Sequence, residues 1–459
     1  MRSQRVILIS PKTSFGRNLQ RTYAGGLGTV NADEHSLLPP LDLLRLAGVL
    51  REDGFDVVVV DEEVASPTEP GSGDLVICHV SLASMREDAR RMGQFAEAGA
   101  RCFAYTSIRR LDHWQEILDL GQCVGLLLPE AVPVVGRLLR GDAQGPGLVT
   151  SENAGKEMLL AHDFGEPADE PLPARDLVDH AKYGFPALSG HRITTMNASF
   201  GCPYPCAFYC PYPLGEGKKV RTYPVARVAA EFEQCAALGI TGVIFRDPIF
   251  TFHRQRTLDL CEAIKRTGTG IKWWCETRID RLDEELIQAM VAAGCVGVEV
   301  GVESGDTRMQ TEAVRKRLRL DTVRSFVDTA RRHDMNIFFL LMLGLPGEDR
   351  LSITNTLRFV MSLGLRSAEF DVSVITPYPG TALHDLALRN NWISEEETSF
   401  TNYDAVMRNE NLSEQDLTEA QQLVAELHRI DGGQAPEALR TEFEAQLTRW
   451  ADAAGGVRA

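Results

Sequence analysis

The sequence predicts an α/β protein with a doubly wound domain, a partial (β/α)6 barrel and a small helical C-terminal region. Two observations carry this prediction: short apolar runs recur along the first 390 or so residues, and segments with helical spacing separate them. Continuous apolar strands that alternate with helices are typical of a parallel sheet covered on both faces. We expect the doubly wound domain at residues 1–145, a linker at 146–190, the barrel at 191–395 and the helical region at 396–459.

The first domain contains one clear helix candidate, at residues 40–53, where the leucines have helical spacing. Its five strand candidates are residues 6–10, 55–60, 75–80, 102–106 and 123–128. The connection from the first strand to the helix, residues 11–40, spans about 30 residues, and loops of that length are usually functional or disordered. It leaves the carboxyl edge of the sheet, where doubly wound domains bind their ligands. We therefore expect a functional loop.

Strand and helix signals alternate again after the Gly-, Glu-, Asp- and Pro-rich linker. The strand candidates are residues 194–199, 242–246, 272–276, 297–302, 336–343 and 369–375. Six such repeats fit a partial barrel, in which chemistry is expected at the carboxyl ends of the strands. Residues 396–459 have a helical, charged pattern without a catalytic signature.

Composition narrows the class of protein. The net charge of −16 argues against a nucleic-acid partner, because phosphate binding needs clustered Lys and Arg. No apolar run reaches the ~20 residues of a membrane span, and the run after the first five residues is shorter than the ~7–15 residues of a signal core. Ten cysteines without regular spacing suggest a reducing cytoplasm. We expect a cytoplasmic protein that acts on a small or carrier-bound molecule.

Three cysteines lie close together in the segment GCPYPCAFYCPYP: Cys202, Cys206 and Cys210. Three thiolates do not complete a structural zinc site, which needs four ligands. They are sufficient for three irons of a 4Fe–4S cluster, which leaves the fourth iron open to bind a substrate or cofactor and pass it one electron. The prolines at 203, 205, 211 and 213 are expected to disfavour a regular helix and to stiffen the loop. Three incidental cysteines are the alternative, which their close spacing disfavours.

Polar residues follow the second and third barrel strands. Asp247, in FRDPIFT, is placed to accept a hydrogen bond from an ammonium group, and the alternative is a solvated loop aspartate. Glu276 and Arg278, in CETRID, are either ligand contacts or an ordinary surface ion pair.

The last three barrel strands also end in motifs suited to a nucleotide-like ligand. Glu303 and Ser304 lie in GVESGD, where the carboxylate suits ribose hydroxyls. Gly344, in GLPGE, lets the backbone approach a ligand. Pro377 and Tyr378, in TPYPGT, form a rigid shelf suited to an adenine ring.

In this order, the cysteine loop and the five motifs resemble the radical S-adenosylmethionine (SAM) enzymes along about 200 residues. The loop departs from their usual CxxxCxxC spacing, because its own spacing is CxxxCxxxC. A doubly wound domain ahead of the barrel, with the stretch PPLDLLRLAGVLREDGFDVVVVD, resembles the cobalamin-dependent, methyltransferase-type subclass. The resemblance implies that the three cysteines ligate the cluster and that the methionine group of SAM chelates its open iron. It also implies that Asp247, Arg278 and Glu303 contact SAM.

The resemblance further implies a reaction. An electron from the cluster, resupplied by an external reductant of flavodoxin or ferredoxin type, cleaves SAM to a 5′-deoxyadenosyl radical, which removes hydrogen from an unactivated carbon. Methylcobalamin then supplies a methyl group. The expected function is methylation of an sp3 carbon, or a phosphinate phosphorus, in specialised metabolism such as antibiotic biosynthesis. The alternatives are a radical enzyme for rearrangement, cyclisation or oxidation, a non-enzymatic iron–sulfur relay or sensor, and, more distantly, a zinc protein.

The first domain departs from the cobalamin pattern of mutases and methionine synthases. Asp33 and His35 keep two positions of a DxHxxG loop that lacks its glycine. The glycine pair usual after the fourth strand is replaced by residues 105–108, and the Gly-Glu-rich turn after the fifth by residues 129–131. We therefore expect cobalamin in a cleft between the two domains, without a histidine bond to cobalt.

Overall fold

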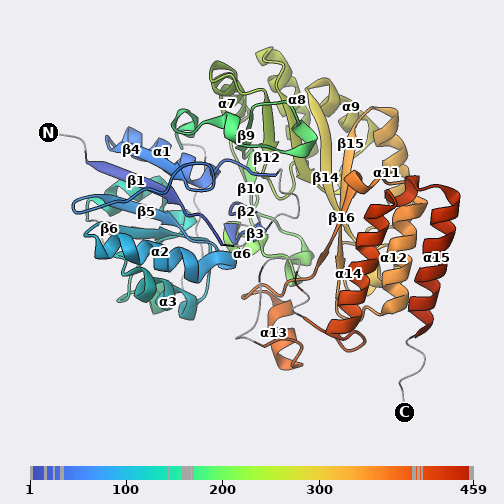
Figure 1. The fold of residues 1–459 in the computed structure, drawn as a ribbon. Coiled ribbons are helices and arrows are strands. Elements are labelled where there is room, and N and C mark those ends of the chain that lie inside the picture. Colours follow the sequence, from blue (N-terminus) through green and yellow to red (C-terminus); the bar gives the residue numbers. More distant parts are fainter. Residues whose placement is uncertain are drawn as a thin grey trace. The chain divides into compact units, whose positions relative to one another are not determined.

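The computed structural model describes residues 4–14, 18–23, 26–30, 36–141, 145–157, 167, 170–394, 400, 404 and 407–453. The chain divides into two compact units. The first comprises Met1–Pro203, Cys210–Pro248 and Glu262–Trp273, and the second comprises Tyr204–Tyr209, Ile249–Cys261 and Trp274–Ala459. Figure 1 shows the elements of both in chain order.

The first sheet has the strand order β4-β1-β5-β6-β7-β8. The five expected strands are present and parallel: β1 (Arg5–Ser10), β4 (Asp56–Asp61), β5 (Leu75–His79), β6 (Arg101–Tyr105) and β7 (Gly125–Leu127). A sixth strand, β8 (Leu148–Val149), was not expected and pairs antiparallel with β7. Chain order runs outward from β1 in both directions, as in a doubly wound sheet.

Helices cover both faces of this sheet (Figure 1). One core joins α1 (Leu41–Glu52) and α4 (Val135–Leu139) to apolar residues of β1, β4, β5 and β6. The paired helices α2 (Met85–Glu97) and α3 (Leu111–Gly121) cover the other face. The apolar faces of these helices explain the continuous apolar strands, which are buried on both sides.

The long connection between β1 and α1 contains a small hairpin. Its strands, β2 (Leu19–Gln20) and β3 (Thr29–Val30), are antiparallel. Between them Gly26 has φ +84°, and a Cβ at that position would lie 2.3 Å from the Ser107 hydroxyl. Only glycine allows such close packing against the carboxyl edge of the sheet. Asp33 and His35 lie outside the described residues.

The expected linker carries structure where it is described. Besides β8 it contains α5 (Ala154–Glu157) and 3-10 turns at Arg175–Leu177, His180–Lys182 and Pro186–Leu188. Gly184 also forms a β-bridge with Leu37. The domain boundaries, including those of the linker, remain a prediction.

The second sheet has the order β16-β15-β14-β13-β12-β9. Its strands match the six candidates within a few residues: β9 (Ile193–Met196), β12 (Gly242–Phe245), β13 (Lys272–Thr277), β14 (Cys295–Glu303), β15 (Asn336–Leu343) and β16 (Phe370–Val374). In the first unit β9 and β12 pair in parallel, and in the second unit β14, β15 and β16 do the same.

Helices follow these strands as the alternating pattern predicts. They are α7 (Val225–Ala237), α8 (Arg254–Thr267), α9 (Glu284–Ala292), α10 (Thr307–Glu312), α11 (Leu320–Arg332), α12 (Arg350–Ser362) and α13 (Ala382–Arg389). The C-terminal region forms α14 (Glu414–Arg429) and α15 (Glu437–Asp452), as expected. A short hairpin, β10 (Ser199–Phe200) and β11 (Arg221–Thr222), lies on either side of the cysteine loop in sequence. Among the described helices, none is both long and apolar enough to cross a membrane.

Candidate functional site

The cysteine loop contains two short helices. Residues Pro205–Phe208 form a 3-10 turn, and α6 spans Tyr212–Glu216. The prolines were expected to disfavour a regular helix, and both helices are short. Each carries a proline in its first turn, where no amide donor is missed. Cys202 and Cys206 are buried and Cys210 is half-buried.

No group of three or more His, Cys, Asp or Glu side chains in the described ranges is arranged to hold a single metal ion. The fit to a cluster therefore rests on the surroundings of the loop. In the second unit, the charges of Lys316 and Arg278 both interact with Cys206. Nearby cations favour the thiolate form, which is the form that binds metal. These surroundings fit an iron–sulfur ligand.

Glu303, at the end of β14, lies in an unusual backbone position. Its φ is +68°, and the pairing of β14 with β15 shifts register between Gly301 and Glu303. The Glu303 side chain, 9% exposed, forms an ion pair with Lys316, whose Nζ also donates to the Gly301 carbonyl at 3.0 Å. Burial lowers the pKa of Lys316, but Glu303 and Cys206 raise it by more, so the ammonium keeps its charge.

Arg278, which follows β13, joins the same network. Its Nε and Nη2 donate to the two Asp280 carboxylate oxygens at 2.9 Å each, and Nη2 also donates to the Lys316 carbonyl at 3.0 Å. The guanidinium lies 4.0 Å above the ring centroid of Tyr204. Its buried Nη1 has no hydrogen-bond partner among the described residues. Arg278 therefore keeps a donor for a ligand.

The segment 314–317 connects this network to the cysteine loop. The Tyr209 hydroxyl donates to the Val314 carbonyl at 3.3 Å, and the Arg315 guanidinium lies 4.0 Å from the ring centroid of Phe208. Arg315 and Arg317 both have positive φ, +57° and +54°. Such conformations cost about 1–3 kcal/mol each and cluster at functional sites. Sequence reasoning missed this segment, although its basic run Arg-Lys-Arg is visible.

Three other expected residues are engaged within the fold. Asp247, fully buried, accepts hydrogen bonds from the Ala198 amide at 2.8 Å and the Ser199 hydroxyl at 2.5 Å. The Ser304 hydroxyl lies 3.1 Å from that of Thr356. Gly344, with φ +88°, donates its amide to the Glu348 carboxylate at 2.5 Å.

The remaining expected residues are Glu276, Pro377 and Tyr378. The Glu276 side chain is half-buried, and its carbonyl accepts a hydrogen bond from the Phe250 amide. Pro377 and Tyr378 are buried, and the tyrosine ring stacks on Phe400 at 6.3 Å between centroids. In the second unit the structure thus brings Arg278 and Glu303 together around Lys316, beside Cys206.

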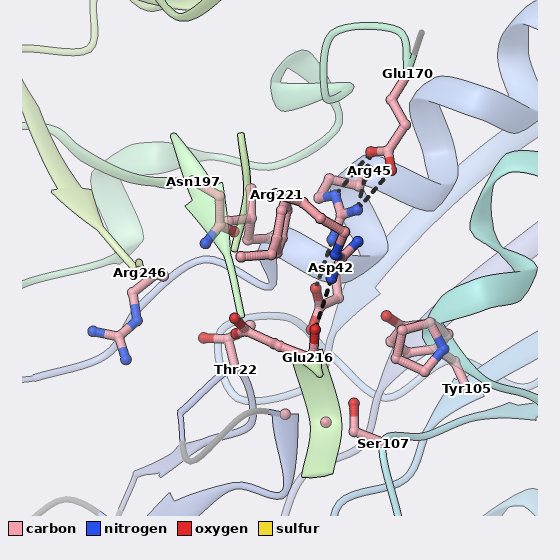
Figure 2. Close-up of a pocket in the computed structure, with 15 residues that line it drawn as sticks. Thr22, Asp42, Arg45, Tyr105, Ser107, Glu170, Asn197, Glu216, Arg221 and Arg246 are labelled. Carbon is pink, nitrogen blue, oxygen red and sulfur yellow. Dashed lines mark hydrogen bonds and ion pairs between the residues drawn. The ribbon is translucent and has the colours of Figure 1, made fainter. Parts of the chain in front are cut away.

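A separate pocket, with about 590 Å³ of empty space that includes open solvent, lies within the first unit (Figure 2). Charged side chains line much of it: Asp42, Arg45, Glu170, Glu216, Arg221 and Arg246. Arg45 forms a two-pronged ion pair with Glu170, 2.9 Å at its shortest. Burial raises the pKa of Glu216 to about 8, so this carboxyl holds its proton at neutral pH. Tyr105 and Ser107 line the cavity from the carboxyl edge of the first sheet.

Arg21 fills the position between β1 and β5, where the strand order reverses. Its guanidinium donates to the carbonyls of Pro11 (2.8 Å) and His79 (3.1 Å), which follow or end these strands. It also forms a two-pronged ion pair with Asp88 of α2, at 2.5 and 2.8 Å. Doubly wound folds usually bind ligands at this point. Here the long loop occupies it with its own side chain.

Residues 196–360, which contain the cysteine loop and the Glu303 network, match the family model of the radical SAM superfamily. This segment, about a third of the chain, is a radical SAM domain. The chain is an enzyme of radical SAM methyltransferase type.

Two curated relatives are methylating enzymes by name. An uncharacterised methyltransferase of Pyrococcus horikoshii is 27% identical over 81% of this chain and 83% of its own length. The hopanoid C-3 methylase of Methylococcus capsulatus is 27% identical over 75% of this chain and 68% of its own. Among solved structures, the radical SAM methyltransferase TsrM of Kitasatospora setae, with cobalamin and a [4Fe-4S] cluster bound, has a TM-score of 0.64 at 16% identity. That match covers 89% of this chain and 83% of TsrM, and it shows a shared fold.

Proposed function

We propose that this chain is a cobalamin-dependent radical SAM methyltransferase that methylates an unactivated sp3 carbon, or a phosphinate phosphorus, of a small molecule in specialised metabolism. In this proposal residues 1–145 bind cobalamin and residues 191–395 form the partial radical SAM barrel. The observation that carries the proposal is the cluster of Arg278, Glu303 and Lys316 beside Cys206.

The proposal assigns Cys202, Cys206 and Cys210 as ligands of one 4Fe–4S cluster. Lys316 and Arg278 keep positive charge near Cys206, which stabilises the thiolates that hold iron. The backbone segment 314–317 supports the cysteine loop through Phe208 and Tyr209. The extra residue of the CxxxCxxxC spacing therefore lies in a part of the loop that has its own supporting contacts.

The same network is proposed to bind SAM. The Arg278 Nη1 donor suits the carboxylate of the methionine group, and Glu303 suits the ribose hydroxyls. Lys316 holds one Glu303 oxygen, which fixes the carboxylate without using its full capacity as an acceptor. Asp247, tied to the turn 198–199, is proposed to shape the site from the end of β12.

Cobalamin is proposed to lie along the carboxyl edge of the first sheet, with part of the molecule in the pocket of the first unit. The polar lining suits a ligand that carries many amide groups, and Gly26 lets the long loop approach Ser107 closely. When bound, the cluster with SAM supplies one-electron chemistry at the substrate, and cobalamin supplies the methyl group. The protein orients these groups and excludes water. A cytoplasmic location and an external one-electron reductant of flavodoxin or ferredoxin type complete the proposal.

Anaerobic incubation of the reconstituted protein with SAM, reductant and candidate small molecules tests the proposed function. Mass spectrometry should detect 5′-deoxyadenosine, S-adenosylhomocysteine and a product heavier by one methyl group. Formation of 5′-deoxyadenosine without methyl transfer, in a protein that retains no cobalamin, would instead indicate rearrangement, cyclisation or oxidation. Iron without SAM binding would indicate an electron-transfer protein.

A further inference from the structure

Four polar residues lie side by side on the neighbouring strands β4, β1, β5 and β6, at the last paired position of these strands. Ser10 pairs with Asp61, and His79 pairs with Tyr105. Ile9 pairs with Cys78, which brings Ser10 level with His79. Residues at one level of a parallel sheet point to the same face. The row therefore runs Asp61, Ser10, His79 and Tyr105 along the carboxyl edge, and all four side chains are buried.

His79 is the member of this row whose side chain lacks hydrogen-bond partners among the described residues. Its ring is 1% exposed, and neither ring nitrogen has a hydrogen-bond partner in the described part of the chain. Burial, followed by the charge of Arg21, lowers the pKa of His79 to about 3, so the ring stays neutral with one donor and one acceptor nitrogen. Its ring packs in a T-shaped arrangement with that of Tyr105, 5.3 Å away between centroids. Leaving both nitrogens unpaired destabilises the fold.

Members of the row line two pockets of the first unit. Ser10 and Asp61 line a cavity of about 310 Å³, Tyr105 lines the 590 Å³ cavity of Figure 2, and Thr22 lines both. His79 lies between Ser10 and Tyr105 and lines neither cavity. A ligand that extends along the sheet edge from one cavity toward the other would reach His79. Ligands of doubly wound domains bind at this edge.

We propose that His79 binds the ligand of the doubly wound domain through hydrogen bonds, and that its partner is an amide group. An amide offers one acceptor and one donor, which complement the two nitrogens of a neutral imidazole. The inference rests on the proposed function, in which the amide-bearing ligand is cobalamin. His79 forms no bond to cobalt, because a ring that is 1% exposed does not protrude to the centre of a corrin.

The test compares His79→Phe with the wild type by titration with hydroxocobalamin. The phenyl ring keeps the contact with Tyr105 and removes both unpaired nitrogens, so the protein without cobalamin should unfold at the same temperature or higher. Its affinity for hydroxocobalamin should fall about tenfold, with an unchanged absorption spectrum of the bound cofactor. His79→Gln, which keeps a donor and an acceptor, should retain more affinity than His79→Leu.

A second buried histidine provides the matched control. Both ring nitrogens of His180 face backbone carbonyls, those of Ile193 (3.0 Å) and Arg175 (2.9 Å), so the neutral ring donates its N–H to one of them. His180→Phe should therefore lower the unfolding temperature and leave the cobalamin affinity of the folded fraction unchanged.

The outcomes separate this inference from the proposed function. If the wild type binds no cobalamin, the proposed function fails. If the wild type binds cobalamin and His79→Phe, His79→Leu and His79→Gln bind it equally well, the role of His79 is overturned. A changed spectrum in the variants would overturn the assignment of a hydrogen bond in favour of cobalt coordination.

Discussion

Two buried ion pairs differ in how many further hydrogen bonds their cations make. One is Arg21–Asp88, near the carboxyl edge of the first sheet, and the other is Lys316–Glu303, at the end of β14. Arg21 has several further acceptors: the carbonyls of Pro11 and His79 and the hydroxyls of Ser81 and Ser84. Lys316 donates to Glu303 and to one carbonyl, that of Gly301.

The difference indicates two roles for buried charge. A charge that makes many hydrogen bonds within the protein fixes structure, and Arg21 holds the long loop against the sheet in this way. The Glu303 carboxylate is bound through one oxygen and belongs to a residue with a strained backbone, so its other oxygen can accept hydrogen bonds from a ligand. We infer that Arg21–Asp88 serves the fold and that Lys316–Glu303 serves cofactor binding.

The largest expected effect tests whether the cysteine loop beside Lys316 binds the 4Fe–4S cluster. Alanine in place of Cys202, Cys206 or Cys210 should abolish the bound cluster, because each supplies one iron ligand. Cys295→Ala, a buried cysteine of β14, is the control and should keep its iron. Iron and sulfide per chain, measured after anaerobic reconstitution, check this. Loss of iron in Cys295→Ala, with Cys210 dispensable, would contradict the assignment.

Arg21→Met tests the structural role of the first pair. It leaves Asp88 buried without its cation, which should cost about 3–5 kcal/mol in the free energy of unfolding. The double variant Arg21→Met/Asp88→Leu should recover most of that loss, because it removes the unpaired charge as well. Denaturant unfolding of both variants is the measurement. Equal stability of Arg21→Met and the wild type would show that the pair does not hold the loop.

Glu303→Gln tests the binding role of the second pair. The amide keeps the shape of the side chain and removes the charge, so SAM affinity should fall by about 1.5–3 kcal/mol, or roughly ten- to a hundredfold. Iron content should stay unchanged, because Glu303 is not a cluster ligand in the proposal. Glu312→Gln, exposed on α10, is the control. Calorimetric titration with SAM checks both, and unchanged affinity in Glu303→Gln would refute the assignment.

The sequence predicted most of the strand framework. The bounds of the strand Asn336–Leu343 were predicted correctly, because a long apolar run ends there in a glycine turn. The strands β2, β3 and β8 were missed, since two-residue strands carry no periodicity. Their positions depend on tertiary packing, such as that of Gly26 against Ser107.

The candidate site was predicted where ordered motifs mark it and missed elsewhere. Arg278 and Glu303 lie in recognisable strand-end motifs, and the structure brings them together. Lys316 was missed because its position depends on the positive φ angles of its two neighbours, which a sequence pattern does not reveal. His79, proposed above as a ligand contact, ends an apolar strand, and its ring nitrogens, unpaired among the described residues, are recognised only in the structure.

The smallest expected effect concerns Glu348, which supports the Gly344 turn after β15. Burial raises its pKa from 4.5 to about 8, so the folded protein keeps a proton that the unfolded chain has already released. Because the unfolded state then binds fewer protons, this group lowers stability as pH rises from about 4.5 to 8. Glu348→Gln cannot ionise, so its stability relative to the wild type should increase across that range. Urea unfolding at pH 5, 6.5 and 8 measures the difference, and a constant difference would show that Glu348 is ionised throughout.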